Sequence, residues 1–578
     1  MRTVTHVTHE AVHKVGGIGA VLQGLMTSAV YQREIGRTFL VAPFFSSQDE
    51  SRVAQEGEIL YSSISGVGGR DIGRKLDGIV QKYNVNLVYG RRRLTGEGGG
   101  AEAQAEVLLV DPTHINRRLE DNFKFNLYKK FGLQSERYEA VDDYLLYLRI
   151  AEPAFDALRA LTARGKGPHF VLAHEYMGMP LALKSILADA PRFRTIFYAH
   201  EVATVRPLVE NASGHDTMFY NAMGRALEAG LSVSDVFGDQ SGFYKHALIE
   251  RAHFCDGIFA VGDLVVDELR FLGPAFRGRE IDLVYNGLPA VPISLDERLA
   301  SREMLQQYGQ NLLGVRPDTV FTHVTRPVVS KGVWRDLRVL EHLDGMFEAR
   351  GRKGVFFLLS TAAGPRAPED VARMESEYGW PVAHRVGAPD LVGTEVDFWR
   401  AVAAYNLRAE AIQAIFINQF GWDRTSCGVR MPEEMSFADL RRGTDVEFGA
   451  SIYEPFGIAP LEPLGFGALC VISSVCGCRG FVTHAAGDAG APNVMVADFV
   501  SLPDAAGLDD AMRIDEAHRD AIERARSLEA AHEILARLPM SDADREAALQ
   551  QGYQLASHMS WDRVCEKFLL PGLARAEG

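Results

Sequence analysis

The chain has 578 residues, more than the roughly 250–300 that one hydrophobic core usually organises, so at least two domains are expected. Hydrophobic residues make up 47% and charged residues 24%, a composition typical of globular proteins rather than disordered chains. The formal net charge of −15 argues against broad nucleic-acid binding and against docking on anionic lipid, although a local basic pocket could still hold a phosphate.

The N-terminal segment MRTVTHVTHEAVHK has no cationic stretch followed by an apolar run, and no run of about 18 apolar residues occurs in the chain. We therefore predict neither an export signal nor a membrane span. The six cysteines have neither paired zinc-ligand spacing nor the density of a disulfide framework, which favours a reduced cytoplasmic protein. The sequence leaves the oligomeric state open, with a homo-oligomer among the alternatives.

Short β-branched or apolar runs alternate with helical stretches, the pattern of a parallel α/β sheet. A first series of strands is expected at TVTHV from Thr3, RTFLVAP from Arg37, HFVLAH from His169, RTIFYAH from Arg194 and DGIFAVG from Asp256. A second series is expected at TVFTHVTR from Thr319, GVFFLLST from Gly354, AIFINQF from Ala414, FGASIY from Phe448 and ALCVISS from Ala468. The predicted fold class is α/β, with two successive Rossmann-like domains.

The segment YNGLPAVPISLDERLA separates the two series, because its Asn286-Gly287 turn and two prolines interrupt regular hydrogen bonding. We place the boundary near residue 290, giving domains at 1–290 and 291–555. The last residues, 556–578, form a plausible amphipathic closing helix. From Val88 to the VLLVDP run, the sequence predicts a hairpin with the glycine-rich tip GEGGG.

The segment HKVGGIGAVLQGL joins the first strand to a helix through Gly16, Gly17 and Gly19. Glycines let backbone N–H groups and the helix start approach an anion closely, and Lys14 adds a positive charge. The alternative is a tight strand-to-helix turn without a ligand. His9 to His13 match the HExxH zinc pattern, but that pattern needs a helix, which the preceding strand and following glycines make improbable. Neither a metal nor another cofactor is predicted.

Polar residues follow several of the predicted strands. His174-Glu175 and His200-Glu201 each come directly after an apolar run, at the carboxyl ends where open α/β sheets bind ligands. The alternative for each is a hydrogen-bonded structural histidine. In the second series, Arg326 and Lys331 lie on one loop after a strand and could converge on a diphosphate. The alternative for these two residues is a solvated surface pair.

The most informative segment is YEPFGIAPLEPLGFGALCVISS, which contains Glu454 and Glu462. Pro455 and Gly457 predict a loop around Glu454, and the later prolines fit the first turn of a helix that contains Glu462. One carboxylate could then bind sugar hydroxyls and the other ribose hydroxyls, while free amides of the helix face a phosphate.

At these residues the sequence resembles glycogen synthase, within the retaining GT-B glycosyltransferases, from the first strand to the final helix. HKVGGIGAVLQ is similar to the family's glycine loop, and YEPFGIAPLEPLGFG to its two-glutamate motif. The segment from GFYKHALIERAHFCDGIFAVG to VYNGLP resembles the animal and fungal enzymes. The resemblance implies two Rossmann-like domains facing a deep cleft, with the C-terminal helix crossing back to the N-terminal domain.

The resemblance also implies roles for individual residues. Glu454 would hold glucose hydroxyls and Glu462 the ribose, and His200 would contact the transferred glucose. The remaining expected contacts are Arg326 and Lys331 at the diphosphate, Lys14 and Gly17 at the diphosphate or acceptor, and Gly16, His174, Asn286 and Gly457 as further substrate-binding residues.

The implied activity is transfer of glucose, with retention and without a metal, from UDP-glucose or ADP-glucose to the non-reducing end of an α-1,4-glucan. Its partners are therefore a nucleotide sugar and a glucan. Two alternatives remain: an enzyme of the same fold that uses a small sugar acceptor, as in sucrose or trehalose-type synthesis, and a non-catalytic glucan-binding paralogue. Glu201 follows His200 where the family usually has a small residue, which bears on the acceptor.

Overall fold

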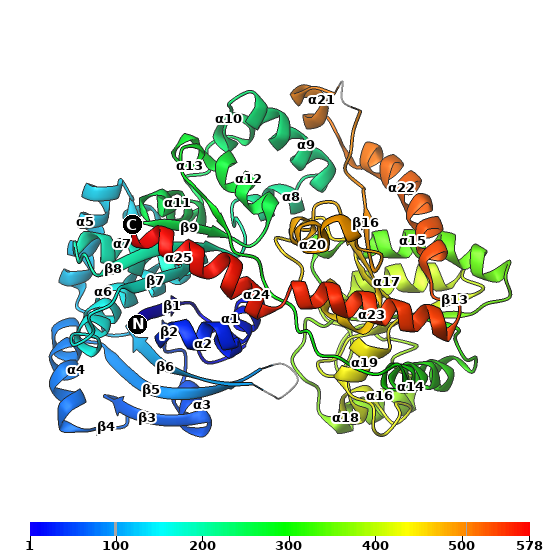
Figure 1. The fold of residues 1–578 in the computed structure, drawn as a ribbon, viewed down its shortest axis with the longest axis horizontal. Helices are drawn as coiled ribbons and strands as arrows, with labels where there is room; N and C mark the ends of the chain where they lie inside the picture. The colour runs from blue at the N-terminus through cyan, green and yellow to red at the C-terminus, as the bar shows by residue number, and fades with distance from the viewer. Residues whose placement is uncertain (15, 97–100, 504–505) are drawn as a thin grey trace. The chain divides into compact units, whose positions relative to one another are not determined.

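The computed structural model describes residues 1–14, 16–96, 101–503 and 506–578 (Figure 1). The chain forms two compact units, each described separately below. The first contains Met1–Pro207, Ala226–Gly287 and Trp561–Gly578, and the second contains Leu208–Arg225 and Leu288–Ser560. No described helix combines the length and apolar character that a membrane crossing requires.

A ten-stranded sheet organises the first unit, in the order β10-β9-β8-β7-β1-β2-β6-β5-β3-β4. Its strands are β1 (Arg2–Val7), β2 (Ile35–Pro43), β3 (Gly57–Ser62), β4 (Val67–Gly68), β5 (Asn86–Thr95), β6 (Glu102–Asp111), β7 (His169–His174), β8 (Phe193–Ala199), β9 (Gly257–Ala260) and β10 (Asp282–Leu283). The strands from β10 through β6 pair in parallel, whereas β5, β3 and β4 add antiparallel partners. All of the strands expected from the first series are present.

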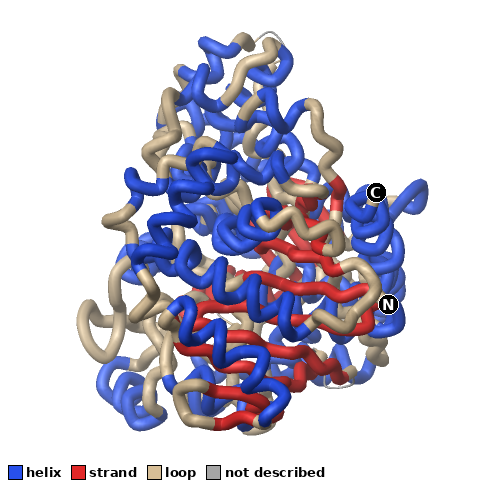
Figure 2. The backbone as a smooth tube through the Cα atoms, turned by 90° about the vertical axis from the view of Figure 1, so that its left-hand side faces the viewer, coloured by secondary structure: helices blue, strands red, loops and turns tan. Residues whose placement is uncertain are grey.

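Helices pack against this sheet, and in Figure 2 they lie over its strands. They are α1 (Gly17–Thr27), α2 (Ala29–Glu34), α3 (Ser47–Glu56), α4 (Arg70–Tyr83), α5 (Arg117–Phe131), α6 (Asp142–Leu161), α7 (Glu175–Leu187), α10 (Val233–Phe237), α11 (Tyr244–Glu250), α12 (Asp263–Leu272) and α13 (Pro274–Arg277). Strand β7 is buried along its whole length, as expected for a parallel strand covered on both faces. The β5–β6 hairpin is confirmed, and its tip at residues 97–100 lies outside the described residues.

The second unit contains a six-stranded sheet in which all pairs are parallel, in the order β13-β12-β11-β14-β15-β16. Its strands are β11 (Thr319–Val324), β12 (Gly354–Leu359), β13 (Ile412–Ile417), β14 (Val446–Gly449), β15 (Leu469–Ser473) and β16 (Val494–Ala497). Apolar clusters cover both faces, one around Phe321 and Phe448 and the other around Trp380 and Phe357. The strand order is that of a Rossmann fold.

The helices of the second unit lie before β11, in the connections between its strands and after β16. They are α14 (Leu295–Leu313), α15 (Val333–Glu348), α16 (Pro368–Tyr378), α17 (Glu395–Asn406), α18 (Arg424–Cys427), α19 (Phe437–Gly443), α20 (Cys478–Ala486), α21 (Leu508–Met512), α22 (Glu516–Arg537) and α23 (Asp542–His558). Helix α14 begins with a capping box, in which Ser294 and Glu297 each satisfy a backbone N–H of the other.

The C-terminal segment returns to the first unit, as the fold prediction requires. It contains α24 (Trp561–Val564), a π-helical turn η6 (Cys565–Leu569) and α25 (Leu570–Glu577). The Asp562 carboxylate accepts a hydrogen bond from Ser28 Oγ at 2.5 Å. A Cβ atom at Gly24 would lie 2.1 Å from the Trp561 ring, so the close approach of these helices requires glycine there. Two Rossmann-like units and a returning terminal helix are the parts of the expected GT-B architecture.

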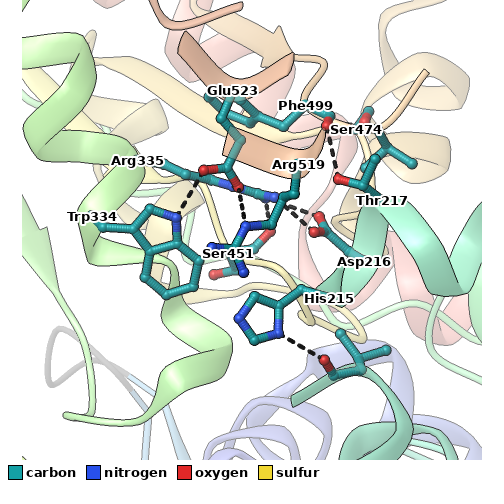
Figure 3. Close-up of polar contacts among 12 residues, drawn as sticks. His215, Asp216, Thr217, Trp334, Arg335, Ser451, Ser474, Phe499, Arg519 and Glu523 are labelled. Atoms are coloured by element: carbon teal, nitrogen blue, oxygen red, sulfur yellow. Dashed lines mark hydrogen bonds and ion pairs between the residues drawn. The ribbon is translucent and has the colours of Figure 1, made fainter. Parts of the chain in front are cut away.

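One segment departs from the expected division of the chain. Residues 208–225 were expected within the first domain but belong to the second unit. This segment contains the end of α8 (Val205–Glu210) and most of α9 (His215–Glu228). Figure 3 shows the reason: Arg335 lies between Asp216 and Glu523. Its guanidinium bonds both Asp216 oxygens, at 2.9 and 2.6 Å, and Glu523 at 2.8 Å, and all three side chains are fully buried. A buried charge needs such partners, which fixes the segment in this unit.

Replacing Asp216 by alanine should destabilise the second unit by about 3–5 kcal/mol, because it leaves the Arg335 charge buried and only partly compensated. The loss of stability would be measured by chemical denaturation, with hydrogen exchange at α15 and α22 as the local probe of the second unit. The control is Glu341→Ala on α15, the helix that carries Arg335. This change removes an exposed ion pair with Arg408 and should cost less than about 1 kcal/mol. Equal losses in the two variants would contradict this role for Asp216.

Candidate functional site

The topology of each sheet marks one place for a ligand. In parallel sheets, ligands bind at the carboxyl ends of the strands where successive connections leave to opposite faces. In the first unit this point lies between β1 and β7, and in the second between β11 and β14. The loops that leave these strands contain the glycine-rich segment, His174, Arg326, Lys331 and Glu454. Sheet topology and sequence motifs therefore select the same loops independently.

In the first unit, the glycine loop is closed around a carboxylate of the chain itself. Glu10 Oε2 accepts hydrogen bonds from the backbone N–H groups of Gly16 at 2.7 Å and Gly19 at 3.0 Å. A Cβ atom at Gly19 would lie 2.7 Å from this oxygen, so the third glycine serves the approach of Glu10. Glu10 thus occupies the anion position at the start of α1. Residues 8–13 form bends rather than a helix, so the HExxH geometry is absent.

A cavity of about 600 Å³ lies against this loop. Its lining includes Glu10, Lys14, Arg52, Arg92, Arg93 and Glu102. The Lys14 ammonium lies 3.4 Å from the Gln23 amide oxygen. At Gly17 an added Cβ would meet nothing within 4 Å, unlike at its glycine neighbours. Of the predicted loop residues, Lys14 lines this cavity and Gly17 has open space beside it, whereas the Gly16 amide already binds Glu10.

Replacing Glu10 by alanine should lower the stability of the first unit by about 3 kcal/mol, since two hydrogen bonds to a buried carboxylate are lost. Hydrogen exchange at the start of α1 would report the loosened loop. Glu102→Ala serves as the control, because Glu102 lines the same cavity but is exposed, and its effect should stay within about 0.5 kcal/mol. Unchanged exchange at α1 in Glu10→Ala would show that the carboxylate does not hold the loop.

Three histidines of the first unit form a continuous hydrogen-bonded row. His6 Nδ1 lies 2.8 Å from His174 Nε2, and His174 Nδ1 lies 2.7 Å from His200 Nε2. His6 is on β1, His174 ends β7 and His200 follows β8, so neighbouring parallel strands bring them together. The rings of His174 and His200 stack with centroids 5.0 Å apart. His174 and His200 thus lie at the ends of neighbouring strands, as expected, and their direct contact and its extension to His6 are additional findings.

Burial keeps these imidazoles neutral. It lowers the pKa of His6 to about 3 and that of His200 to about 3, with His6 adding to the effect at His200. Burial lowers the pKa of His174 well below its ordinary value, and His200 and His6 lower it further. Burial also lowers the pKa of His169, on β7, to about 3.

Glu175 holds the loop that follows β8. Its Oε1 accepts hydrogen bonds from the backbone N–H groups of His200 and Glu201. Its backbone has a φ of 58°, a left-handed conformation that is strained for a non-glycine residue and often occurs at functional sites. Burial, followed by the nearby Glu201 carboxylate, raises the pKa of Glu175 well above its ordinary value. The sequence pointed to the His174-Glu175 pair but gave no sign of this supporting contact.

The buried histidines predict acid sensitivity of the first unit. Their folded-state pKa values lie below the unfolded value of about 6.5, so the unfolded chain binds more protons as the pH falls. Their stabilisation is complete above pH 6.5 and declines below it, by up to about 1.4 kcal/mol per histidine per pH unit. Hydrogen exchange of β1, β7 and β8 at pH 7.5 and 5.5, corrected for intrinsic rates, would measure this. Equal protection at the two pH values would contradict it.

In the second unit, Lys331 and Glu454 form an ion pair. Lys331 ends the short 3-10 helix η3 (Val329–Lys331), and its side chain and that of Glu454 are about 15% and 14% exposed. Gly332 has a φ of 60°, and a Cβ there would lie 2.6 Å from the Ala450 carbonyl oxygen. The glycine thus lets the two loops approach closely enough for the pair to form. Arg326, on the same loop as Lys331, is exposed and has no ion-pair partner among the described residues.

Two further glycines shape the loop around Glu454. Gly457 has a φ of 90°, and a Cβ there would lie 2.7 Å from Cys476 Sγ and 3.0 Å from Glu454 Cγ. Gly477 approaches the Pro455 carbonyl so closely that a Cβ would lie 1.7 Å from its oxygen. The Cys476-Gly477-Cys478 segment is therefore a tight loop that supports Glu454. Among the described residues, no three His, Cys, Asp or Glu side chains are grouped as metal ligands would be.

Glu462 lies in the first turn of a helix, as expected. This helix, η4 (Ala459–Phe466), is a 3-10 helix, and Pro463 inside it lacks a backbone N–H. Its carboxylate is 3.1 Å from Arg441 Nε, and the same guanidinium reaches Glu447 at 3.1 Å. The two glutamates of the motif therefore have different cationic partners, Lys331 for Glu454 and Arg441 for Glu462. The sequence analysis did not identify Arg441 or Glu447.

The last predicted contact, Asn286, follows β10 in the first unit. Its side chain is buried, and its Oδ1 has no hydrogen-bond partner in the part of the chain that the structure describes. A cavity of about 410 Å³ in the second unit lies at the amino ends of β15 and β16, lined by Leu469 and Asn493. It is at the opposite end of these strands from the switch point.

No protein-family model matches the chain, and no curated protein matches it. The solved structures to which it is similar along nearly its whole length include the following three. A starch synthase IV catalytic domain from Arabidopsis thaliana bound to ADP and acarbose is 14% identical, covers 96% of this chain and 99% of its own, and has a TM-score of 0.47. An α,α-trehalose-phosphate synthase (UDP-forming) from Burkholderia xenovorans with glucose-6-phosphate is 12% identical, with coverages of 99% and 100% and a TM-score of 0.48.

The third structure, described as trehalose-6-phosphate from E. coli bound with UDP-2-fluoro glucose, is 10% identical, with coverages of 100% and 99% and a TM-score of 0.49. At identities of 10–14% and TM-scores below 0.5, these likenesses carry no conclusion about what this chain binds or catalyses.

Proposed function

We propose that this protein is a retaining glucosyltransferase of the glycogen or starch synthase type, which transfers glucose from UDP-glucose or ADP-glucose to the non-reducing end of an α-1,4-glucan. The observation that carries the proposal is the Lys331–Glu454 pair at the switch point of a Rossmann sheet, with Arg326 on the same loop. A Rossmann sheet places ligands at this edge, and here the edge offers both cations and a carboxylate.

The roles follow from the chemistry of each group. Arg326 and Lys331 would neutralise the charge that develops on the departing diphosphate, which is commonly the largest catalytic contribution. Arginine offers planar paired hydrogen bonds to phosphate, and lysine a compact charge. Glu454 would accept hydrogen bonds from glucose hydroxyls, and Glu462 from the ribose. Binding of a donor would then replace the Lys331–Glu454 pair with contacts from each partner to a different part of the nucleotide sugar.

The proposed chemical step retains the configuration at the anomeric carbon. The acceptor hydroxyl oxygen forms a bond to that carbon on the face from which the diphosphate oxygen departs. The acceptor proton passes to the leaving phosphate oxygen, so the chain need not supply a base. Positioning and charge stabilisation then account for the rate. In this scheme two side-chain cations, rather than a metal ion, neutralise the leaving group.

The second candidate is transfer to a small sugar or sugar phosphate. The cavity beside the glycine loop favours it, because Lys14, Arg52, Arg92 and Arg93 line it together with three glutamates and could meet an anionic acceptor. Arg52 and Arg92 are both paired with Glu56 in the structure. A glucan-binding paralogue without activity is the third reading. Nucleotide release from UDP-glucose and ADP-glucose, each with glycogen, maltooligosaccharide, glucose or glucose-6-phosphate, together with sizing of the product, separates the three.

Replacing Lys331 or Glu454 by alanine should reduce kcat/KM by about 100- to 1000-fold, the usual loss when one preorganised group at the reacting charge is removed. The fold should persist, because both residues lie on loops at the sheet edge. Lys353→Ala is the control, since this exposed lysine of the same unit contacts the Glu410 carbonyl and should keep full activity. Unreduced transfer by folded Lys331→Ala or Glu454→Ala would refute the assigned roles.

A further inference from the structure

The row of histidines in the first unit continues beyond His6 to two hydroxyl groups. His6 Nε2 lies 3.1 Å from Tyr31 Oη, and Tyr31 Oη lies 3.0 Å from Thr38 Oγ1. We call the five side chains of Thr38, Tyr31, His6, His174 and His200 the hydrogen-bonded chain. Because Thr38 is on β2 and Tyr31 is on α2, this hydrogen-bonded chain runs from β2 through α2, β1 and β7 to the end of β8. Tyr31 and both inner histidines are buried, with His6 and His174 fully so.

Every ring nitrogen of the two inner histidines is used. His6 and His174 each contact one neighbour through Nδ1 and another through Nε2. His200 uses Nε2 for His174, and its Nδ1 has no partner among the described residues. A neutral imidazole has one N–H and one lone pair. Each contact between rings therefore needs an N–H from one histidine and a lone pair from the other, and the tautomers of the three must change together.

The hydroxyl end of the chain selects one of the two arrangements. A phenol is more acidic than an aliphatic alcohol, so Tyr31 is the better donor to an imidazole nitrogen and Thr38 the natural donor to Tyr31. Tyr31 O–H then donates to His6 Nε2, which places the His6 proton on Nδ1. The same logic places the protons of His174 and then His200 on Nδ1. The last group in the chain is therefore an Nδ1–H at the carboxyl edge of the sheet.

We propose that Tyr31, His6 and His174 are positioning residues that hold His200 as its Nδ1–H tautomer, so that His200 donates a hydrogen bond to a hydroxyl oxygen of the bound sugar. That a sugar hydroxyl accepts this hydrogen bond rests on the proposed function, whereas the tautomer of His200 does not. A histidine whose ring nitrogens had no hydrogen-bond partner would have no fixed tautomer. The hydrogen-bonded chain fixes the His200 Nδ1–H donor before the sugar binds. Less rearrangement of protons and side chains is then needed on binding.

The tautomer can be measured directly in the free protein. Protein labelled with ¹⁵N-histidine should show the His200 signals, assigned with the His200→Ala variant, as a protonated Nδ1 and an unprotonated Nε2. Tyr31→Phe removes only the hydroxyl that sets the direction, so a second set of His200 signals should appear. The control is Tyr144→Phe, which removes a buried hydroxyl that is not part of the hydrogen-bonded chain and that donates to Ser135 Oγ at 2.7 Å. This variant should leave the His200 signals unchanged.

A kinetic readout follows with the same variants. Tyr31→Phe should lower kcat/KM for the nucleotide sugar about tenfold, and Tyr144→Phe less than twofold. In a His200→Ala background, Tyr31→Phe should have no further effect, because the two changes act through one group.

Two results would overturn the proposal: a His200 protonated at Nε2 in the unaltered protein, or His200 signals that do not respond to Tyr31→Phe. If the signals behave as expected but none of the nucleotide sugars is turned over, the hydrogen-bonded chain stands and the proposed function fails. Circular dichroism and thermal unfolding of each variant establish that the fold is intact.

Discussion

The ion pair between Lys331 and Glu454 depends on the way the second sheet is connected. The connections that follow β11 and β14 leave to opposite faces, so the loops diverge and a carboxyl edge stays open between them. Gly332 lets the first loop pass close to Ala450, and Gly457 lets the second turn around Glu454. Without these two backbone approaches, an ammonium and a carboxylate at the ends of separate strands would remain solvated. In the first unit the same constraint brings the loops after β1 and β7 to one carboxyl edge.

Buried charged groups that hold specific partners support both edges. Arg335 lies about one helical turn after Lys331, and its charge is neutralised by Asp216 and Glu523. All three side chains are fully buried. In the first unit, Glu10 satisfies the amides at the start of α1, and Glu175 holds the backbone after β8. Such groups are costly to bury unless they are paired, so their presence beneath the loops implies that loop geometry has been kept at the expense of a simpler apolar core.

The sequence predicted the strands and the loops of the site because these depend on local signals. Apolar β-branched runs marked the strands, and glycine or proline next to charged residues marked the loops that follow them. The contacts that fix those loops were not predictable in the same way. Glu10 was visible only as part of a misleading zinc-like pattern, and its role depends on a turn that brings the carboxylate back to Gly16 and Gly19.

Long-range contacts explain the remaining differences. The pairing of Asp216 with Arg335 joins residues 119 positions apart and moves residues 208–225 into the second unit, which no local composition reveals. Likewise, the β-branched run TVTHV predicts that His6 lies in a strand, but only the pairing of β1 with β7 places it against His174. Glu462, too, has a partner that the sequence did not reveal, because nothing in the spacing of the two residues indicates its ion pair with Arg441.

A crystal structure with UDP-glucose or ADP-glucose bound tests the central claim most directly. The account predicts that the diphosphate lies within hydrogen-bonding distance of Arg326 and Lys331, and that Glu454 has left Lys331 to bind the hexose hydroxyls. A nucleotide sugar bound away from the β11–β14 edge, with the Lys331–Glu454 pair still closed, would contradict it.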